Sequence, residues 1–213
     1  MLKYLIPIIF FCNSVKAQSD NYGISLDKLD AKEKEQIIVF TIGKAEGTIF
    51  PATYAKRILD NGPIDKQRTF FMPDTALIRK IDTQMVEQFC IAKLSFNQNN
   101  WDATIKALEA RNDKKSLKIA KKQHADQRKQ FDFFCPKWQT QLPYKYKQYI
   151  GYRNANGEEI IYIQLLDFSD DPYKLKSYFS TSWISGWHDW FETHTSRYHF
   201  NVQKNLLTIN EDI

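Results

Sequence analysis

The segment YKYKQYIGYRNANGEEIIYIQLLDF, residues 144–168, constrains the fold more than any other part of the chain. Two runs rich in tyrosine and isoleucine flank the turn sequence Asn-Ala-Asn-Gly at residues 154–157, and this pattern predicts a β-hairpin. The second run is apolar on both alternating faces, with Ile161, Ile163 and Leu165 on one and Ile160 and Tyr162 on the other. Because neighbouring residues of a strand point to opposite faces, we expect this strand to be central and covered on both sides.

The C-terminal residues predict further strands. Tyr198, Phe200 and Val202 alternate within the run RYHFNVQ and would share one face of a strand. A turn near Lys204 and Asn205 would lead to a last short strand at residues 206–209. The C-terminal part of the chain is therefore expected to form consecutive antiparallel strands.

Helices are predicted upstream, most clearly in residues 71–94. Pro73 and Asp74 suit the first turn of a helix. Apolar residues follow at three- and four-residue spacing, which would turn one stripe toward a core: Leu77, Ile78, Ile81, Met85, Phe89 and Ala92. The polar run at residues 98–100 breaks the pattern and is expected to end it.

Two shorter elements precede that helix. Residues 25–40 begin polar and end apolar, which suggests a helix running into a strand. Residues 53–62 form a short helical pattern that stops at Asn61-Gly62. Helices first and consecutive strands afterwards predict an α+β fold, with N-terminal helices followed by an antiparallel β-meander of about four strands.

Residues 1–17 have the three parts of a secretory signal peptide. Lys3 supplies the positive start, residues 5–12 form an apolar run too short to cross a bilayer, and residues 15–17 suit signal peptidase. Cleavage after Ala17 would release the mature chain into the periplasm, onto the cell surface or into the medium.

Cleavage would leave one α+β domain at residues 18–213, with a basic helical segment near 104–130 and no transmembrane anchor. The alternative is a lipoprotein signal ending at Cys12. Phe10 and Phe11 stand directly before this cysteine, where lipid attachment favours small residues.

Two cysteines remain after the predicted cleavage, Cys90 and Cys135. An even number of cysteines in an oxidising compartment favours a disulfide. Two buried free thiols are the alternative, since two cysteines need not lie within bridging distance.

Basic residues concentrate within residues 106–129. The whole chain carries a formal charge of +5, which falls to +3 when Lys3 and Lys16 leave with the signal peptide. The densest lysines would form either a surface for anionic partners or a solvated helix face: Lys114, Lys115, Lys118, Lys121 and Lys122. No aromatic residue lies among the basic ones as stacking on bases would require, so no nucleic-acid partner is expected.

Residues 182–200, SWISGWHDWFETHTSRYHF, combine tryptophans with histidines. They suggest either core packing or a sugar-binding platform made by Trp187, Trp190 and Tyr198. If a strand begins at Trp187, then Trp187 and Trp190 point to opposite faces. His188 and His194 would stand about 20 Å apart along that strand, too far to bind one metal ion together. We therefore predict no metal site and no cofactor.

The C-terminal third resembles a family of small exported bacterial proteins of unknown function. That family has a YKRQYVGY-type hairpin followed by a Trp and YFNV-type strands, and its pattern favours a strand from Trp187. The matching residues are Tyr146, Gln148, Tyr149, Gly151, Tyr152, Gly157, Trp187, Phe200, Asn201 and Val202. The family's Asp-Gly-Gly turn is absent, and THTSR at residues 193–197 takes its place. The resemblance implies a fold but no activity.

The sequence leaves two classes of function for this protein, a binding module and a hydrolase. The chain contains no nucleophile elbow, HExxH, glycine-rich phosphate loop or paired-carboxylate motif, so no catalytic residue is identified. We expect a non-enzymatic binding or interaction module with a protein, a glycan or an anionic envelope component as its partner. The alternative is a hydrolase of cell-envelope or extracellular substrates, which would need a pocket where His, Asp or Glu converge.

Overall fold

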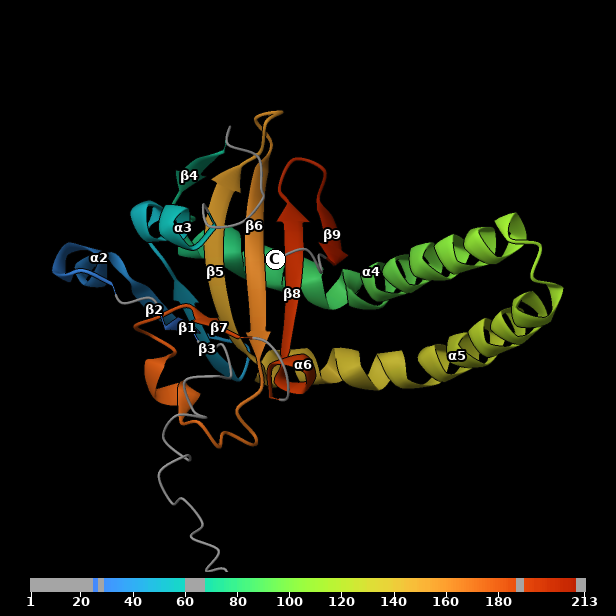
Figure 1. Ribbon diagram of the computed structural model, residues 1–213. Coiled ribbons are helices and arrows are strands. Elements are labelled where there is room, and N and C mark those ends of the chain that lie inside the picture. Colours follow the sequence, from blue (N-terminus) through green and yellow to red (C-terminus); the bar gives the residue numbers. More distant parts are fainter. Residues whose placement is uncertain (1–24, 27–28, 60–67, 187–189, 210–213) are drawn as a thin grey trace, which may run out of the picture.

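The computed structural model describes residues 25, 26, 29–59, 68–186 and 190–209 (Figure 1). It is an α+β fold whose main sheet has seven strands in the order β2-β3-β5-β6-β8-β9, with β4 also paired to β5. A separate two-stranded sheet joins β1 to β7. The strands are β1 (Ser25–Leu26), β2 (Ile38–Ile42), β3 (Ala45–Ile49), β4 (Thr69–Phe71), β5 (Tyr146–Arg153), β6 (Glu159–Leu166), β7 (Ile184–Ser185), β8 (Thr195–Asn201) and β9 (Leu206–Ile209).

The helices lie at the start, the middle and the C-terminal part of the chain. They are α2 (Ala31–Gln36), α3 (Ala52–Leu59), α4 (Thr75–Ala110), α5 (Lys114–Gln141) and α6 (Trp190–His194), with 3-10 turns η1 (Leu142–Tyr144) and η2 (Leu175–Tyr178). The α+β class is confirmed. The predicted order is wrong, because β2, β3 and β4 precede the long helices and the sheet exceeds four strands.

The additional strands start with a hairpin between β2 and β3. Gly43 has a φ of +62° in the two-residue turn between them, and such turns need a residue with positive φ. β3 then pairs with β5 in parallel, with Gly47 opposite Lys147 and Ile49 opposite Tyr149. The sheet is therefore mixed, although most of its pairings are antiparallel.

The predicted β5–β6 hairpin is confirmed, and β6 is a central strand between β5 and β8. Ile161, Ile163 and Leu165 pack in the core on the α4 face of the sheet. Ile160 and Tyr162 pack on the opposite face, where α3 and Trp183 lie. The expectation that β6 is covered on both sides therefore holds.

Helix α4 begins as predicted, since the Asp74 carboxylate caps it by accepting a hydrogen bond from the Leu77 N–H at 2.7 Å. Its buried stripe consists of Ile78, Ile81, Met85, Phe89 and Ala92. The predicted end near residues 98–100 is wrong, because α4 continues to Ala110. Gln98 donates a hydrogen bond of 2.9 Å to Asp102, one helical turn later, and this contact stabilises the helix through its polar stretch.

The second half of α4 and most of α5 leave the sheet as an antiparallel helical hairpin (Figure 1). We call residues 93–137 the arm. The overhang follows from length: the 36 residues of α4 extend about 54 Å, whereas the eight residues of β5 extend only about 27 Å. The basic segment near 104–130 is therefore the end of α4, a turn and the start of α5 rather than one helix.

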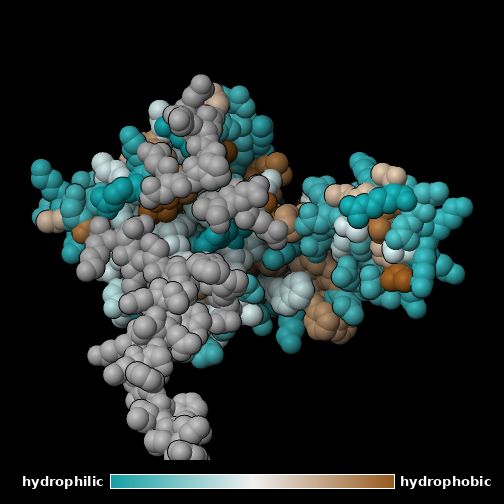
Figure 2. All heavy atoms as spheres, in the orientation of Figure 1, coloured by the Kyte–Doolittle hydropathy of each residue, from teal (hydrophilic) through white to brown (hydrophobic). Residues whose placement is uncertain are grey.

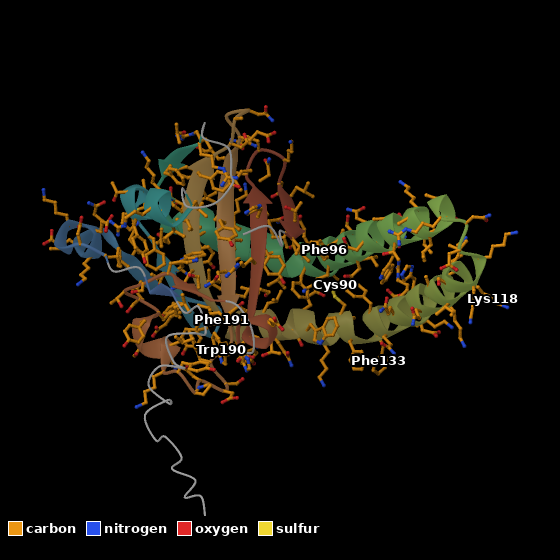
Figure 3. The ribbon with its side chains drawn as sticks, in the orientation of Figure 1. Cys90, Phe96, Lys118, Phe133, Trp190 and Phe191 are labelled. Carbon is orange, nitrogen blue, oxygen red and sulfur yellow. A yellow bond between two sulfur atoms is a disulfide. The ribbon has the colours of Figure 1, made fainter. Side chains whose placement is uncertain are left out.

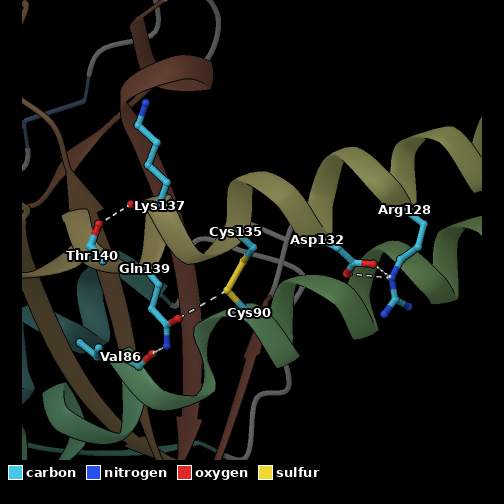
Figure 4. Close-up of a disulfide and its surroundings, with 8 residues drawn as sticks. All are labelled: Val86, Cys90, Arg128, Asp132, Cys135, Lys137, Gln139 and Thr140. Carbon is cyan, nitrogen blue, oxygen red and sulfur yellow. Dashed lines mark hydrogen bonds and ion pairs between the residues drawn. A yellow bond between two sulfur atoms is a disulfide. The ribbon is translucent and has the colours of Figure 1, made fainter.

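A disulfide joins Cys90 to Cys135 where the arm leaves the sheet (Figure 4). The two Cα atoms are 5.8 Å apart, within the usual bridging distance. Cys135 is buried in the core between α4, α5 and the sheet. The predicted pairing is thus present, and it links the two helices of the arm at their base.

The strand predicted from Trp187 is not found. Residues 187–189 lie outside the described part of the chain, and Trp190 begins the short helix α6. Adjacent Trp190 and Phe191 are both buried. A strand would send these neighbours to opposite faces, whereas in this helical turn both belong to one apolar cluster that includes Leu166 and Leu175.

Two buried glutamines hold the loop before α6 against the sheet. The Gln148 side chain donates to the carbonyl oxygens of Phe179 and Ser182 at 2.8 and 2.7 Å and accepts from the Ile184 N–H at 3.1 Å. The Gln164 amide donates to Gln148 Oε1 at 3.3 Å. Buried polar groups need such partners, so this network fixes the loop on the face opposite α4.

In the part of the chain that the structure describes, no helix is both long enough and apolar enough to cross a bilayer.

Candidate functional site

The arm carries the net positive charge of the protein. Residues 93–137 contain eleven Lys and Arg against five Asp and Glu, a net charge of +6 against +5 for the whole chain. The remaining residues therefore have a net charge of −1. The arm is a basic projection from a nearly neutral body.

The α5 surface turned away from α4 is exposed along its whole length. We call it the outer face of α5. Its charged and large apolar residues recur at three-, four- and seven-residue spacing: Lys115, Lys118, Ile119, Lys122, Asp126, Lys129, Phe133 and Lys137. The opposite surface of α5 packs against α4 and the sheet through Ala120, Phe131 and Cys135.

Two apolar side chains interrupt this basic surface. Phe133 is 77% exposed and Ile119 is 50% exposed. In Figure 3, Phe133 points away from α4, and Lys118 projects near the far end of the arm. Figure 2 shows the arm as mainly hydrophilic with isolated hydrophobic residues.

Ion pairing leaves most of these lysines available. Two ion pairs of the arm join Lys121 to Glu109 at 3.4 Å and Arg128 to Asp132 at 3.0 Å, and neither involves a lysine of the outer face of α5. Asp126 is the only acidic residue on the outer face of α5. The face therefore presents nearly unopposed positive charge. All five lysines singled out from the sequence are exposed, as expected for a solvated helix face.

A second surface of the arm is a groove between its two helices. Phe134 and Trp138 stack on α5 with ring centroids 6.1 Å apart and planes 16° apart. The groove holds about 420 Å³. It is lined by Lys93, Asn97 and Trp101 from α4 and by Gln127, Gln130, Phe131, Phe134 and Trp138 from α5.

Lys93 and Trp138 also line a cleft of about 300 Å³ at the base of the arm. Polar side chains from α6, from β8 and from Asp167 directly after β6 line it, among them Glu192 and His194. His194 stacks on Trp190 with centroids 5.1 Å apart, and its Nδ1 lies 3.1 Å from the Trp190 carbonyl oxygen. Carboxylate and histidine side chains therefore line one cleft, as the active site of a hydrolase would require.

Asp167 in this cleft is held in its charged form. Burial alone would raise the pKa of Asp167, but hydrogen bonds from Lys145 and Ser169 lower it to about 2. An aspartate with so low a pKa neither donates a proton at neutral pH nor readily accepts one. Its contact with Lys145 is a structural ion pair at the rim of the cleft.

His199 lies on the opposite face of the sheet between aromatic rings. Its ring centroid is 5.0 Å from that of Tyr162 and 6.0 Å from that of Tyr152. Burial, and secondarily the positive charge of Arg68, lower the pKa of His199 to about 4. His199 is therefore neutral at physiological pH.

Two of the three rings predicted to form a sugar platform are buried. Trp190 is 4% exposed and Tyr198 is 1% exposed, so neither offers a face for stacking. Trp187 and His188 lie outside the described residues. Among the residues that are described, no group of three or more His, Cys, Asp or Glu side chains is placed to hold a metal ion.

Sequence reasoning missed the aromatic residues of the arm. Phe131, Phe134 and Trp138 recur at three- and four-residue spacing directly after the basic segment. That spacing indicates one helical face. Phe131 is buried, whereas the exposure of Phe134 and Trp138 depends on the projection of the arm beyond the sheet, which local pattern does not reveal.

Comparisons with protein-family models, with curated proteins and with solved structures found no match to this chain. The resemblance of the C-terminal third to an exported family therefore stays a prediction.

Proposed function

We propose that this protein is an exported, non-enzymatic binding module that engages an anionic component of the cell envelope through its arm. The observation that carries the proposal is the concentration of net charge +6 in a projecting helical hairpin. Long-range attraction of this kind favours an oppositely charged partner and accelerates its encounter.

The arrangement of the arm supports a binding role over a packing role. Toward its tip the arm buries little beyond Ala120, while the disulfide and Phe131 hold its base on the sheet. A rigid base with an exposed, charged end presents a preorganised surface, which limits the entropy lost on binding. Export is supported by the signal-like residues 1–17 and by the disulfide, which is typical of oxidising compartments.

The test compares two variants with equal charge change. In the first, Lys114, Lys115, Lys118, Lys121 and Lys122 are all replaced by Gln. In the control, five exposed lysines outside the arm are replaced by Gln: Lys32, Lys34, Lys56, Lys80 and Lys174. Both variants should melt close to the parent, because exposed side chains contribute little to stability.

Sedimentation with isolated cell envelopes at moderate ionic strength provides the measurement. We expect the parent and the control to bind and the arm variant to lose most of its binding. Equal binding by the two variants would assign the interaction to another surface.

A second candidate function is hydrolysis of cell-envelope or extracellular substrates. The presence of Glu192 and His194 in the lining of the cleft favours it. Hydrolase activity would require release of soluble fragments from purified envelope polymers by the parent and loss of that release in both Glu192→Gln and His194→Ala. If the parent releases no fragments, this candidate is rejected.

A further inference from the structure

The outer face of α5 combines a long row of lysines with exposed apolar side chains, and few kinds of anionic partner would contact both. Its lysines extend from Lys115 to Lys137, about 33 Å along one side of the helix. Phe133 stands among them, exposed away from the protein core (Figure 3). Such a surface is long, convex and basic, with single apolar side chains projecting from it.

This shape and chemistry fit a flat partner with a charged surface and an apolar interior. A glycan bound in a site would need concave aromatic walls and amide groups, which lie instead in the groove between α4 and α5. Compact ammonium groups on flexible stems suit dispersed headgroup phosphates, and an exposed phenylalanine between them can enter the acyl region.

We propose that the outer face of α5 lies on the surface of an anionic phospholipid bilayer, with Phe133 and Ile119 inserted between headgroups. The inference rests on the proposed function and names the envelope component. The lysines supply attraction, each raising the partition coefficient by about fivefold. The loss of four should therefore weaken binding by roughly 600-fold.

The charge dependence is tested by sedimentation with vesicles of phosphatidylcholine, alone or mixed with phosphatidylglycerol. The parent should bind the mixed vesicles and not the neutral ones, and added salt should release it. Replacement of Lys115, Lys118, Lys122 and Lys129 by Gln should abolish binding. The matched replacement of Lys32, Lys34, Lys56 and Lys80, exposed lysines outside the arm, should leave it intact.

The insertion of Phe133 is tested with a paired substitution. Phe133→Ser should weaken binding to the mixed vesicles by about tenfold, since it removes the apolar contact without changing charge. Ile91→Ser is the control, because Ile91 is 68% exposed on α4, away from the outer face of α5. Circular dichroism melting of every variant verifies that the fold is retained.

The outcomes separate the two proposals. Binding to isolated envelopes without binding to the mixed vesicles would overturn the bilayer inference and leave the proposed function standing. Equal binding to neutral and anionic vesicles, or equal loss in Phe133→Ser and Ile91→Ser, would also overturn it. Absence of binding to both envelopes and vesicles would reject the proposed function as well.

Discussion

Lys147 is unusual because lysine side chains are rarely buried completely. Its side chain is fully buried under α4, and its ammonium lies 3.0 Å from Asp82 Oδ1. The hydroxyl of Tyr149 shares this region, and burial, together with the Asp82 charge, raises the pKa of Tyr149 well above 10. A buried charge with one oppositely charged partner depends strongly on that partner.

Removing Asp82 should therefore destabilise the protein severely. We expect Asp82→Ala to lower the free energy of unfolding by about 3–5 kcal/mol, because it leaves the buried ammonium uncompensated. The double variant Lys147→Met with Asp82→Leu should recover most of this loss. Urea unfolding of the three proteins is the measurement, and an Asp82→Ala variant as stable as the parent would contradict the dependence on this pair.

His199 should make stability depend on pH. Its pKa is about 4 in the fold, against 6.5 for an ordinary histidine, so the unfolded chain binds a proton first as the pH falls. Stability from this group is complete above pH 6.5 and declines toward pH 4, by about 3 kcal/mol in total.

The measurement is urea unfolding at a series of pH values for the parent and for His199→Gln. Tyr152, Tyr162 and Arg68 remain in both proteins, so the difference in pH slope isolates the histidine. Parallel pH profiles would show that His199 does not titrate in this way.

At the scale of elements, the disulfide is a constraint on the base of the arm. It closes a loop of 45 residues, which the chain-entropy model values at about 4 kcal/mol. Cys90→Ser combined with Cys135→Ser should lower the free energy of unfolding by about that amount, measured in guanidinium chloride. A reducing agent should destabilise the parent similarly and leave the double variant unchanged; an insensitive parent would indicate that the thiols are not bonded.

Elements whose signals are local could be predicted from the sequence. The Asp74 cap and the apolar stripe of α4 lie within a few turns of one helix, and the β5–β6 hairpin is marked by its own turn. β3 was missed because its sequence AEGTI has few strand-forming residues, and its place depends on parallel pairing with β5, about 100 residues later.

The basic residues of the candidate site can be predicted from the sequence, but the projecting arm that carries them cannot. The five lysines were recognised as a surface for anionic partners or a solvated face, and they are exposed. The sequence does not predict the arm, because the polar run at residues 98–100 indicates the end of a helix. Amide side chains are only mildly unfavourable in helices, and packing of α5 against α4 outweighs that local preference.

At the scale of the whole molecule, the structure has two parts with different physical roles. The sheet and the sheet-proximal turns of α4 and α5 contain the apolar clusters, whereas the described residues of the arm tip are largely exposed. Charge follows the same division, with the net positive charge on the arm. Stability and binding should therefore be separable by shortening the arm.

A truncated chain tests this separation. Residues 98–127 are replaced by a short glycine-containing turn, which can join two antiparallel helices whose axes lie about 8–10 Å apart. The core residues Phe89, Ala92 and Phe131 and the disulfide all remain. We expect the truncated protein to melt cooperatively within a few degrees of the parent, because it loses little buried apolar area.

The same truncated protein should lose its binding to isolated envelopes, since it lacks most of the lysines of the outer face of α5. Thermal melting and envelope sedimentation measured on one preparation give both results. Loss of cooperative melting would mean that the arm tip contributes to the folding core. Retained binding by a stably folded truncated chain would place the interaction on the sheet rather than on the arm.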